Sequence, residues 1–249
     1  MKKTKIIIPA LGLLLLSTAA SVTGTVAWFA ANGQVTATGM SVTAKTNGAF
    51  LQIKPKGGSI TADGTTANAS TASATVFPAK YNGTDGSDTW RYAYAAATNA
   101  ATYDGTYRDV AAADVADYRL KNEFTIFAKE TVATTSKVYN LHVKSCTVTG
   151  TSAFLDAVSL VIVCGTNVQQ ISAHGQTTAT SWNIANPVTL AAEVGEGNSG
   201  VDVAIYTYLD GDNSTVYTDN ATSANLTGIG VTVVFETQSS APAQQQQNP

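Results

Sequence analysis

Residues suited to acid–base, metal or nucleophilic chemistry are few in this sequence. It contains two histidines, His142 and His174, and neither stands in an H-E-x-x-H motif or close to a second metal ligand. His142 alternates with Lys144 on a predicted exposed strand face, and His174 lies in the loop sequence SAHGQ. The serine-hydrolase motif G-x-S-x-G is absent. We therefore predict no enzymatic activity, no catalytic or metal-binding residues and no cofactor.

An acidic segment with the sequence DGDNSTVYTDN begins like a calcium-binding loop. Asp210, Asp212 and Ser214 occupy alternate positions, as oxygen ligands do in such loops. The sixth position is Thr215 instead of glycine, and the twelfth is Ala221 instead of glutamate. An Asp/Gly turn is the better interpretation, with weak calcium binding as the alternative.

Cys146 and Cys164 are the two cysteines of the chain. In an exported protein two cysteines can form a disulfide. Cys146, however, has the opposite parity to the apolar residues Tyr139, Leu141 and Val143 of its own predicted strand. A disulfide and a pair of buried free thiols therefore both fit the sequence.

The elements that carry these residues are predicted to be short β-strands. The body is rich in Thr, Val, Ser, Asn and Gly and poor in Leu, Lys and Glu, which favours strands and turns over long helices. On the order of ten strands separated by turns predict an all-β, jelly-roll-like two-sheet sandwich with loop elaborations. The predicted strands are 35–45, 49–54, 122–130, 137–148, 157–165, 168–172, 180–184, 188–194, 201–209 and 228–237. One short helix is predicted over 109–118, with Asp109 as its cap.

The N-terminus has the layout of a secretory signal peptide. Three lysines precede the apolar run Ile6–Leu16, and small residues follow as far as Ala27. Thr25 and Ala27 occupy positions −3 and −1 of a cleavage site before Trp28, so we expect a secreted protein. The alternative is a membrane anchor that is never removed, because an apolar helix ending near Trp28 could cross a bilayer.

These features divide the chain into three parts. Residues 1–27 are the signal peptide or anchor. Residues 28–238 form the β-sandwich domain, with an N-terminal extension over 28–34. Residues 239–249 are polar and low in complexity, which predicts a disordered tail.

Charge excludes one class of partner. From Trp28 to Lys144 there are 11 Lys and Arg against 9 Asp and Glu, whereas residues 145–249 contain 8 acidic residues and no Lys or Arg. Nucleic-acid binding requires clustered Lys and Arg and is not expected. The asymmetry fits either a solvated surface or head-to-tail attraction between copies.

The junction between the signal and the first strand resembles the TasA/camelysin family of secreted fibre proteins. The likeness is clearest over Leu13–Lys45. In that family a small residue and a Trp or Phe end the junction, and Asn or Asp and an S-G-x-L-x-L-x-A-K-like strand follow. The matching positions here are Ala27, Trp28, Phe29, Asn32, Thr38, Gly39, Met40, Val42, Ala44 and Lys45. The Asp that many members have just after the aromatic residue is absent.

The resemblance implies a protein that polymerises by donor-strand complementation, in which a freed N-terminal segment adds a strand to the sheet of another copy. The expected donor segment is Trp28, Phe29, Ala30, Ala31, Asn32, Gly33, Gln34 and Val35. The strand over 38–45 is expected to stay in its own subunit. The expected function is a secreted structural protein of extracellular filaments or biofilm matrix, with itself as partner. The alternative is a membrane-anchored cell-surface or virion structural protein with the same sandwich.

Overall fold

The computed structural model describes residues 40–46, 51–59, 66–69, 76–94, 106–128, 137–150, 154–172, 180–184, 186–196, 199–213, 216, 226 and 229–238. The chain divides into two units, Met1–Thr36 and Ala37–Pro249, and every described residue lies in the second. The predicted signal, the donor segment and the tail over 239–249 lie outside the described residues. Among the residues described, no helix is long and apolar enough to cross a membrane.

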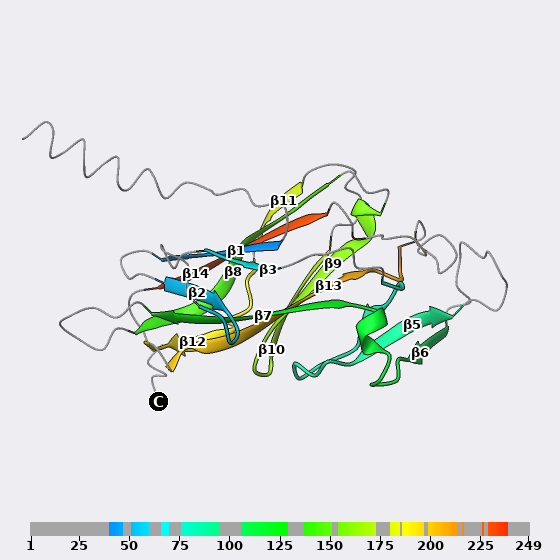
Figure 1. The fold of residues 1–249 in the computed structure, drawn as a ribbon, viewed down its shortest axis with the longest axis horizontal. Coiled ribbons are helices and arrows are strands. Elements are labelled where there is room, and N and C mark those ends of the chain that lie inside the picture. Colours follow the sequence, from blue (N-terminus) through cyan, green and yellow to red (C-terminus); the bar gives the residue numbers. More distant parts are fainter. Residues whose placement is uncertain are drawn as a thin grey trace, which may run out of the picture. The chain divides into compact units, whose positions relative to one another are not determined.

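Two β-sheets share one hydrophobic core, which confirms the predicted all-β sandwich (Figure 1). The first sheet contains β1 (Met40–Thr46), β3 (Thr66–Ala69), β8 (Val138–Thr149), β11 (Thr180–Asn183), β12 (Ala191–Val194) and β14 (Gly230–Gln238). The second sheet contains β2 (Leu51–Pro55), β7 (Leu120–Ala128), β9 (Val158–Cys164), β10 (Asn167–Ser172) and β13 (Val201–Leu209). A small third sheet contains β4 (Lys80–Tyr81), β5 (Trp90–Tyr94) and β6 (Thr106–Asp109).

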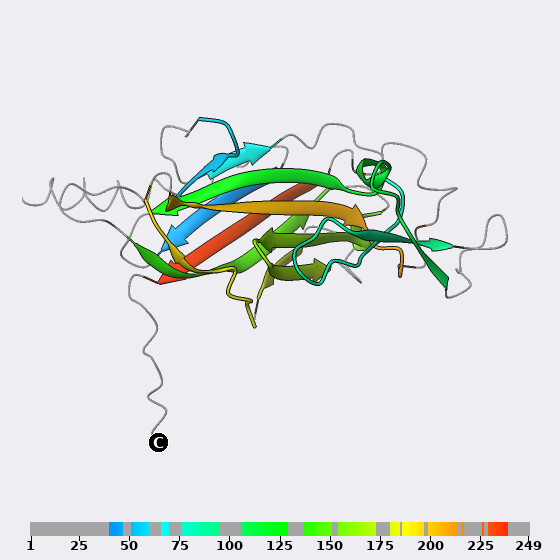
Figure 2. The same ribbon diagram turned by 90° about the horizontal axis from the view of Figure 1, so that it is seen from below.

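The strand order of the two main sheets is that of a jelly roll with three additional strands, β1, β2 and β12. If β3, β7, β8, β9, β10, β11, β13 and β14 are numbered 1 to 8, the first sheet has the order 1-8-3-6 and the second 2-7-4-5. β1 is inserted between strands 1 and 8 of the first sheet. β2 extends the second sheet beside β7, and Figure 2 shows β7 and β13 crossing in front of β1 and β14.

Alternation along the strands determines which residues fill the core. Alternation predicts that Ile229, just before β14, shares one face with Val231, Val233 and Phe235 of that strand, and all four are buried. It predicts the same for Phe124, Ile126 and Ala128 of β7, which are also buried. β9 is buried along its whole length because its two faces are both covered. Its even-numbered apolar residues enter the main core, and Val161 and Val163 pack against the small third sheet. This double burial explains the continuous apolar run in its sequence.

A register shift in β8 explains the position of Cys146. The pairing of β8 with β14 shifts between Val234 and Phe235, which inserts an extra residue into β8. Val143 and Cys146 are both fully buried as a result, although they lie three residues apart. Uniform alternation, which would place Cys146 on the outer face, is therefore wrong for this strand.

A second shift lies near the start of β8. The pairing moves again between Glu236 and Gln238, beside Asn140, whose φ of 56° is unusual for a residue other than glycine. Leu141 is buried, whereas Tyr139 is only half-buried. The prediction that grouped Tyr139 with Leu141 and Val143 is wrong because this second shift also interrupts the alternation of β8.

Helical structure in the described residues is limited to two single 3-10 turns, η1 (Val115–Asp117) and η2 (Leu155–Ala157). The helix predicted over 109–118 is therefore too long. Asp109 ends β6 instead of capping a helix, because it is the register partner of Arg91 in the small third sheet. Only η1 remains helical, and it buries Val115.

Candidate assembly site

β1 has a pairing that no other described strand shares. It runs parallel to β14 over its whole length, from Met40 to Thr46. Its other edge pairs antiparallel with β3 through residues 40–43. The remaining pairs between described strands are all antiparallel. β1 therefore separates the first and last strands of the jelly roll, which would otherwise be neighbours.

The inner face of this seam belongs to the main core. On β14, Val231, Val233 and Phe235 are at most 1% exposed. Their register partners on β1 are Met40 with Val231, Val42 with Val233, and Ala44 with Phe235. The register therefore aligns three backbone positions of β1 with the buried row of β14.

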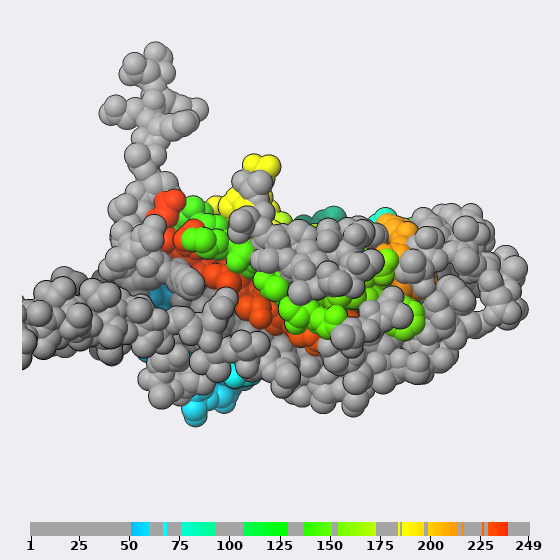
Figure 3. Space-filling model, turned by 90° about the horizontal axis from the view of Figure 1, so that it is seen from above, coloured from blue at the N-terminus to red at the C-terminus, as the bar shows by residue number. Residues whose placement is uncertain are grey.

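The outer face of the first sheet carries a charge cluster on β8 and β14, which lie side by side in Figure 3. Lys144 Nζ lies 2.5 Å from Glu236 Oε1, and His142 Nε2 lies 3.7 Å from Glu236 Oε2. His142 Nδ1 lies 2.7 Å from the Asn140 carbonyl oxygen. A carbonyl only accepts, so Nδ1 carries the proton that it donates there. The cluster holds the Glu236 carboxylate in place at the edge of the seam.

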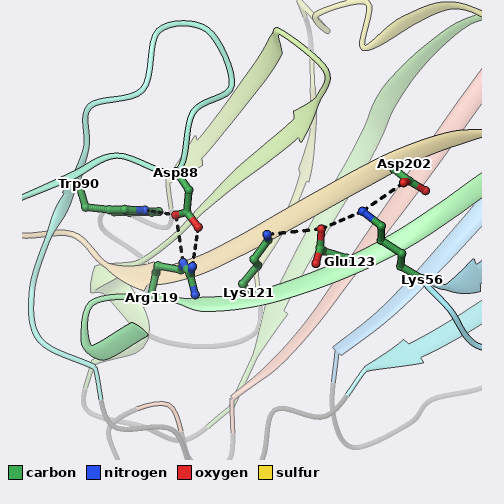
Figure 4. Close-up of polar contacts among 7 residues, drawn as sticks. All are labelled: Lys56, Asp88, Trp90, Arg119, Lys121, Glu123 and Asp202. Atoms are coloured by element: carbon green, nitrogen blue, oxygen red, sulfur yellow. Dashed lines mark hydrogen bonds and ion pairs between the residues drawn. The ribbon is translucent and has the colours of Figure 1, made fainter. Parts of the chain in front are cut away.

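A second polar cluster joins the small third sheet to the second sheet (Figure 4). Asp88 accepts hydrogen bonds from the Trp90 indole at 2.7 Å and from Arg119 through both of its carboxylate oxygens. Burial by itself raises the pKa of Asp88, but the hydrogen bonds from Arg119 and Trp90 outweigh it and lower the pKa below its ordinary value. This bidentate pair fixes the loop before β5 to the start of β7.

Aromatic rings pack around Trp90, whose indole donates to Asp88. Trp90 contacts Tyr81, Tyr206 and Tyr208 edge-to-face, with ring centroids 4.9 to 5.8 Å apart. The Arg119 guanidinium lies 5.4 Å from the centre of the Tyr206 ring. Burial raises the pKa of Tyr206 to about 12, so the phenol stays neutral. The arrangement is a packed aromatic core and not an open binding site.

Further charged residues lie along the face of the second sheet on which Arg119 pairs with Asp88 (Figure 4). Glu123 lies 3.4 Å from Lys121 and 3.3 Å from Lys56, and Lys56 lies 3.2 Å from Asp202. Thr125 donates a hydrogen bond to Asp202 at 2.8 Å, and this bond together with Lys56 lowers the pKa of that carboxyl. These exposed pairs contribute little free energy each.

Only some of the site residues predicted from the sequence lie in the described part of the structure. Thr25, Ala27 and the donor segment Trp28–Val35 lie outside the described residues, as does His174. Cys146 and Cys164 are both buried and free. Within the described residues, no group of three or more His, Cys, Asp or Glu side chains could hold a metal ion.

The described part of the acidic segment has the geometry of a turn. The Asp212 N–H donates to Asp210 Oδ1 at 2.9 Å, as in an Asx turn. Lys80 Nζ lies 2.8 Å from Asp212 Oδ2, so an ammonium group occupies the position next to this carboxylate. Asn213 donates to the Asp156 carbonyl and fastens the turn to η2.

Residues 195–200, GEGNSG, match the spacing G-x-G-x-x-G of dinucleotide-binding proteins. That motif joins a strand to a helix, whereas these residues lie between β12 and β13. A Cβ at Gly200 would lie 2.7 Å from the Ile126 carbonyl oxygen. Close packing against β7 explains the glycine at position 200.

Sequence reasoning also missed Glu236, Asp88 and Arg119. Glu236 shows a signal, because it is the one charged residue in an otherwise uncharged strand. Asp88 and Arg119 show none, since their partnership depends on how two sheets pack.

Comparison with known proteins finds no matching family model, no matching curated protein and no matching solved structure.

Proposed function

We propose that this chain is a secreted structural protein that self-assembles into extracellular filaments or surface matrix by donor-strand complementation. The exchanged part is the N-terminal arm, which we define as Trp28–Thr46 and which includes β1. A second copy of the chain is the partner, and neither a cofactor nor a small-molecule substrate takes part.

The insertion of β1 is the observation that carries this proposal. Eight of the other ten strands in the two main sheets complete a jelly-roll order without it. β1 is also the first of the described strands and begins a few residues after the predicted donor segment, which ends at Val35. A strand with these properties can be supplied by another copy without any change in the connections among the other eight.

The energetics favour exchange over simple loss of the strand. Without β1, the edges of β14 and β3 would present unpaired N–H and C=O groups, which attract another strand. A β1 from a second copy would make the same contacts as the chain's own β1. The exchanged and closed forms then differ little in contact energy, and protein concentration favours exchange.

The donor segment Trp28–Val35 is proposed to lead the arm. It is uncharged and carries two adjacent aromatic residues, the residue type that most often anchors interfaces. This proposal changes the sequence-based expectation that residues 38–45 stay in their own subunit. The whole arm moves as one unit.

Export and processing can be tested together on material from the host. We expect N-terminal sequencing of the exported protein to start at or near Trp28 and electron microscopy to show regular filaments. An intact Met1 in a membrane fraction, with no filaments, would support the membrane-anchored alternative and contradict the proposal.

A deletion tests the leading segment. Removing residues 28–34 leaves every described strand in place, so the domain is expected to fold while filament yield falls sharply. Unfolding midpoint and filament yield should be measured on the same sample. Normal filaments from the deleted chain would remove this segment from the mechanism.

A further inference from the structure

The seam around β1 is almost free of charge. Lys45 is the one charged residue of β1, and in the sequence it is the first after Lys5. Glu236 is the one charged residue of β14, and β3 has none. Lys45 and Glu236 are register partners. β1, β3 and β14 therefore contain one residue of each charge sign, and the two occupy partnered backbone positions.

Glu236 is held on the outer face by contacts to β8, which do not involve β1. Its neighbours Phe235 and Thr237 are buried, so the alternation of β14 places Glu236 outside. Its side chain is 22% exposed, and Lys144 on β8 approaches one carboxylate oxygen to 2.5 Å. The backbone register places position 45 of β1 opposite Glu236.

Apolar alternation alone cannot set the register of this seam. The β1 residues in register with the buried Val231, Val233 and Phe235 are Met40, Val42 and Ala44, so both strands are apolar at every second position. A slip of two residues would keep every side chain on its face. It would, however, move Lys45 away from Glu236.

We infer that the Lys45–Glu236 pair determines the register in which β1 docks beside β14, and so selects the incoming strand. When β1 docks within its own chain, this inference does not depend on the proposed function. For a strand from a second copy it rests on the proposed function.

Charge-reversal variants of the full-length chain distinguish docking of β1 within one chain from docking between copies. One variant carries Lys45→Glu. The other carries Lys144→Glu with Glu236→Lys, which keeps the ion pair between β8 and β14 while reversing the charge offered to β1. Each variant alone places like charges in register, and we expect about a three- to ten-fold loss of pelletable polymer at a fixed concentration. An equimolar mixture restores opposite charges between copies in both directions and is expected to recover wild-type yield.

The exposed pair of Lys137 and Glu193, 2.7 Å apart between β8 and β12, supplies the matched control. Chains with Lys137→Glu or Glu193→Lys should assemble normally, alone or mixed. A third chain, K45E/K144E/E236K, restores the pair within one molecule and should regain the wild-type unfolding midpoint.

The outcomes are distinguishable. If each reversed chain polymerises as well as the wild type, the register inference is wrong and strand exchange stands. If the triple variant recovers stability but the mixture recovers no polymer, the pair sets the register within one chain and exchange between copies is wrong. Failure of both the triple variant and the mixture overturns the inference.

Discussion

The Asp88 carboxylate accepts three hydrogen bonds, one from the Trp90 indole and two from the Arg119 guanidinium. The two bonds from Arg119 are charge-assisted and bidentate, and such pairs are stronger than hydrogen bonds between neutral groups. The stability that Asp88 contributes depends on its charge. Because its pKa is lowered in the folded state, this contribution is present above the unfolded pKa and is lost as the pH falls through the folded pKa.

The first prediction concerns this carboxylate. Asp88→Asn is expected to lower the free energy of unfolding by about 1–3 kcal/mol at pH 7, allowing for partial solvent screening. Urea unfolding at several pH values checks it. The difference from wild type should shrink as the pH falls below about 4, because the wild-type carboxyl is then protonated in the unfolded state and increasingly in the folded state.

Asp109 provides the control on the same small sheet. It pairs with Arg91 at 2.6 Å, but its side chain is 75% exposed. Asp109→Asn should therefore change stability by less than about 0.5 kcal/mol. Equal losses from the two substitutions would contradict the role given to Asp88.

The second prediction concerns the thiols. Burial raises the pKa of Cys146 to about 12 and that of Cys164 to about 11, so neither forms the reactive thiolate near neutral pH. In the folded protein at pH 8 both should react with a thiol reagent only at the rate of unfolding, and both should react at once in urea. An intact mass two hydrogens too low, or fast labelling without denaturant, would contradict this result.

At the scale of elements, periodicity predicted the strands with uniform alternation. The inward residues of β7 and β14 could be read from the sequence because their apolar residues in the main core fall at every second position. β8 could not be read this way, since its two register shifts arise from its pairing with β14 and leave no mark in its own sequence. The small third sheet was missed because its strands are short and are held by packing against β9 and β13.

The third prediction tests how the small sheet is docked. Gly86 has a φ of 80°, and a Cβ there would lie 2.1 Å from the Gly165 carbonyl oxygen in the turn between β9 and β10. Gly86→Ala therefore combines an unfavourable backbone conformation with a backbone collision. We expect a loss of about 2–4 kcal/mol, measured by chemical unfolding.

Gly57 separates the two effects. Its φ is 74°, but a Cβ there would meet nothing within 4 Å. Gly57→Ala should cost only the conformational term, about 1 kcal/mol. If the two substitutions cost the same, the contact between residues 86 and 165 does not hold the small sheet in place.

For the whole molecule, composition and strand spacing were enough to predict a sandwich, but not the position of β1. Strand order depends on contacts between residues far apart in the sequence. Here the first described strand joins the last one in parallel, and no local pattern around Met40–Thr46 indicates a parallel partner. The start of the proposed arm is, however, suggested by the sequence itself, through the predicted export signal and the two adjacent aromatic residues Trp28 and Phe29.

The central claim is that β1 passes from one copy to the next, and cysteine cross-linking of assembled material tests it most directly. Thr43 and Val234 are register partners on the outer face of the seam, and Thr232 and Thr147 are register partners on β14 and β8. A chain with Thr43→Cys and Val234→Cys, oxidised after assembly, should give a ladder of covalent oligomers on a denaturing gel. The control chain with Thr232→Cys and Thr147→Cys should give monomers only. Filaments in which every disulfide across the seam lies within a single chain would contradict strand exchange.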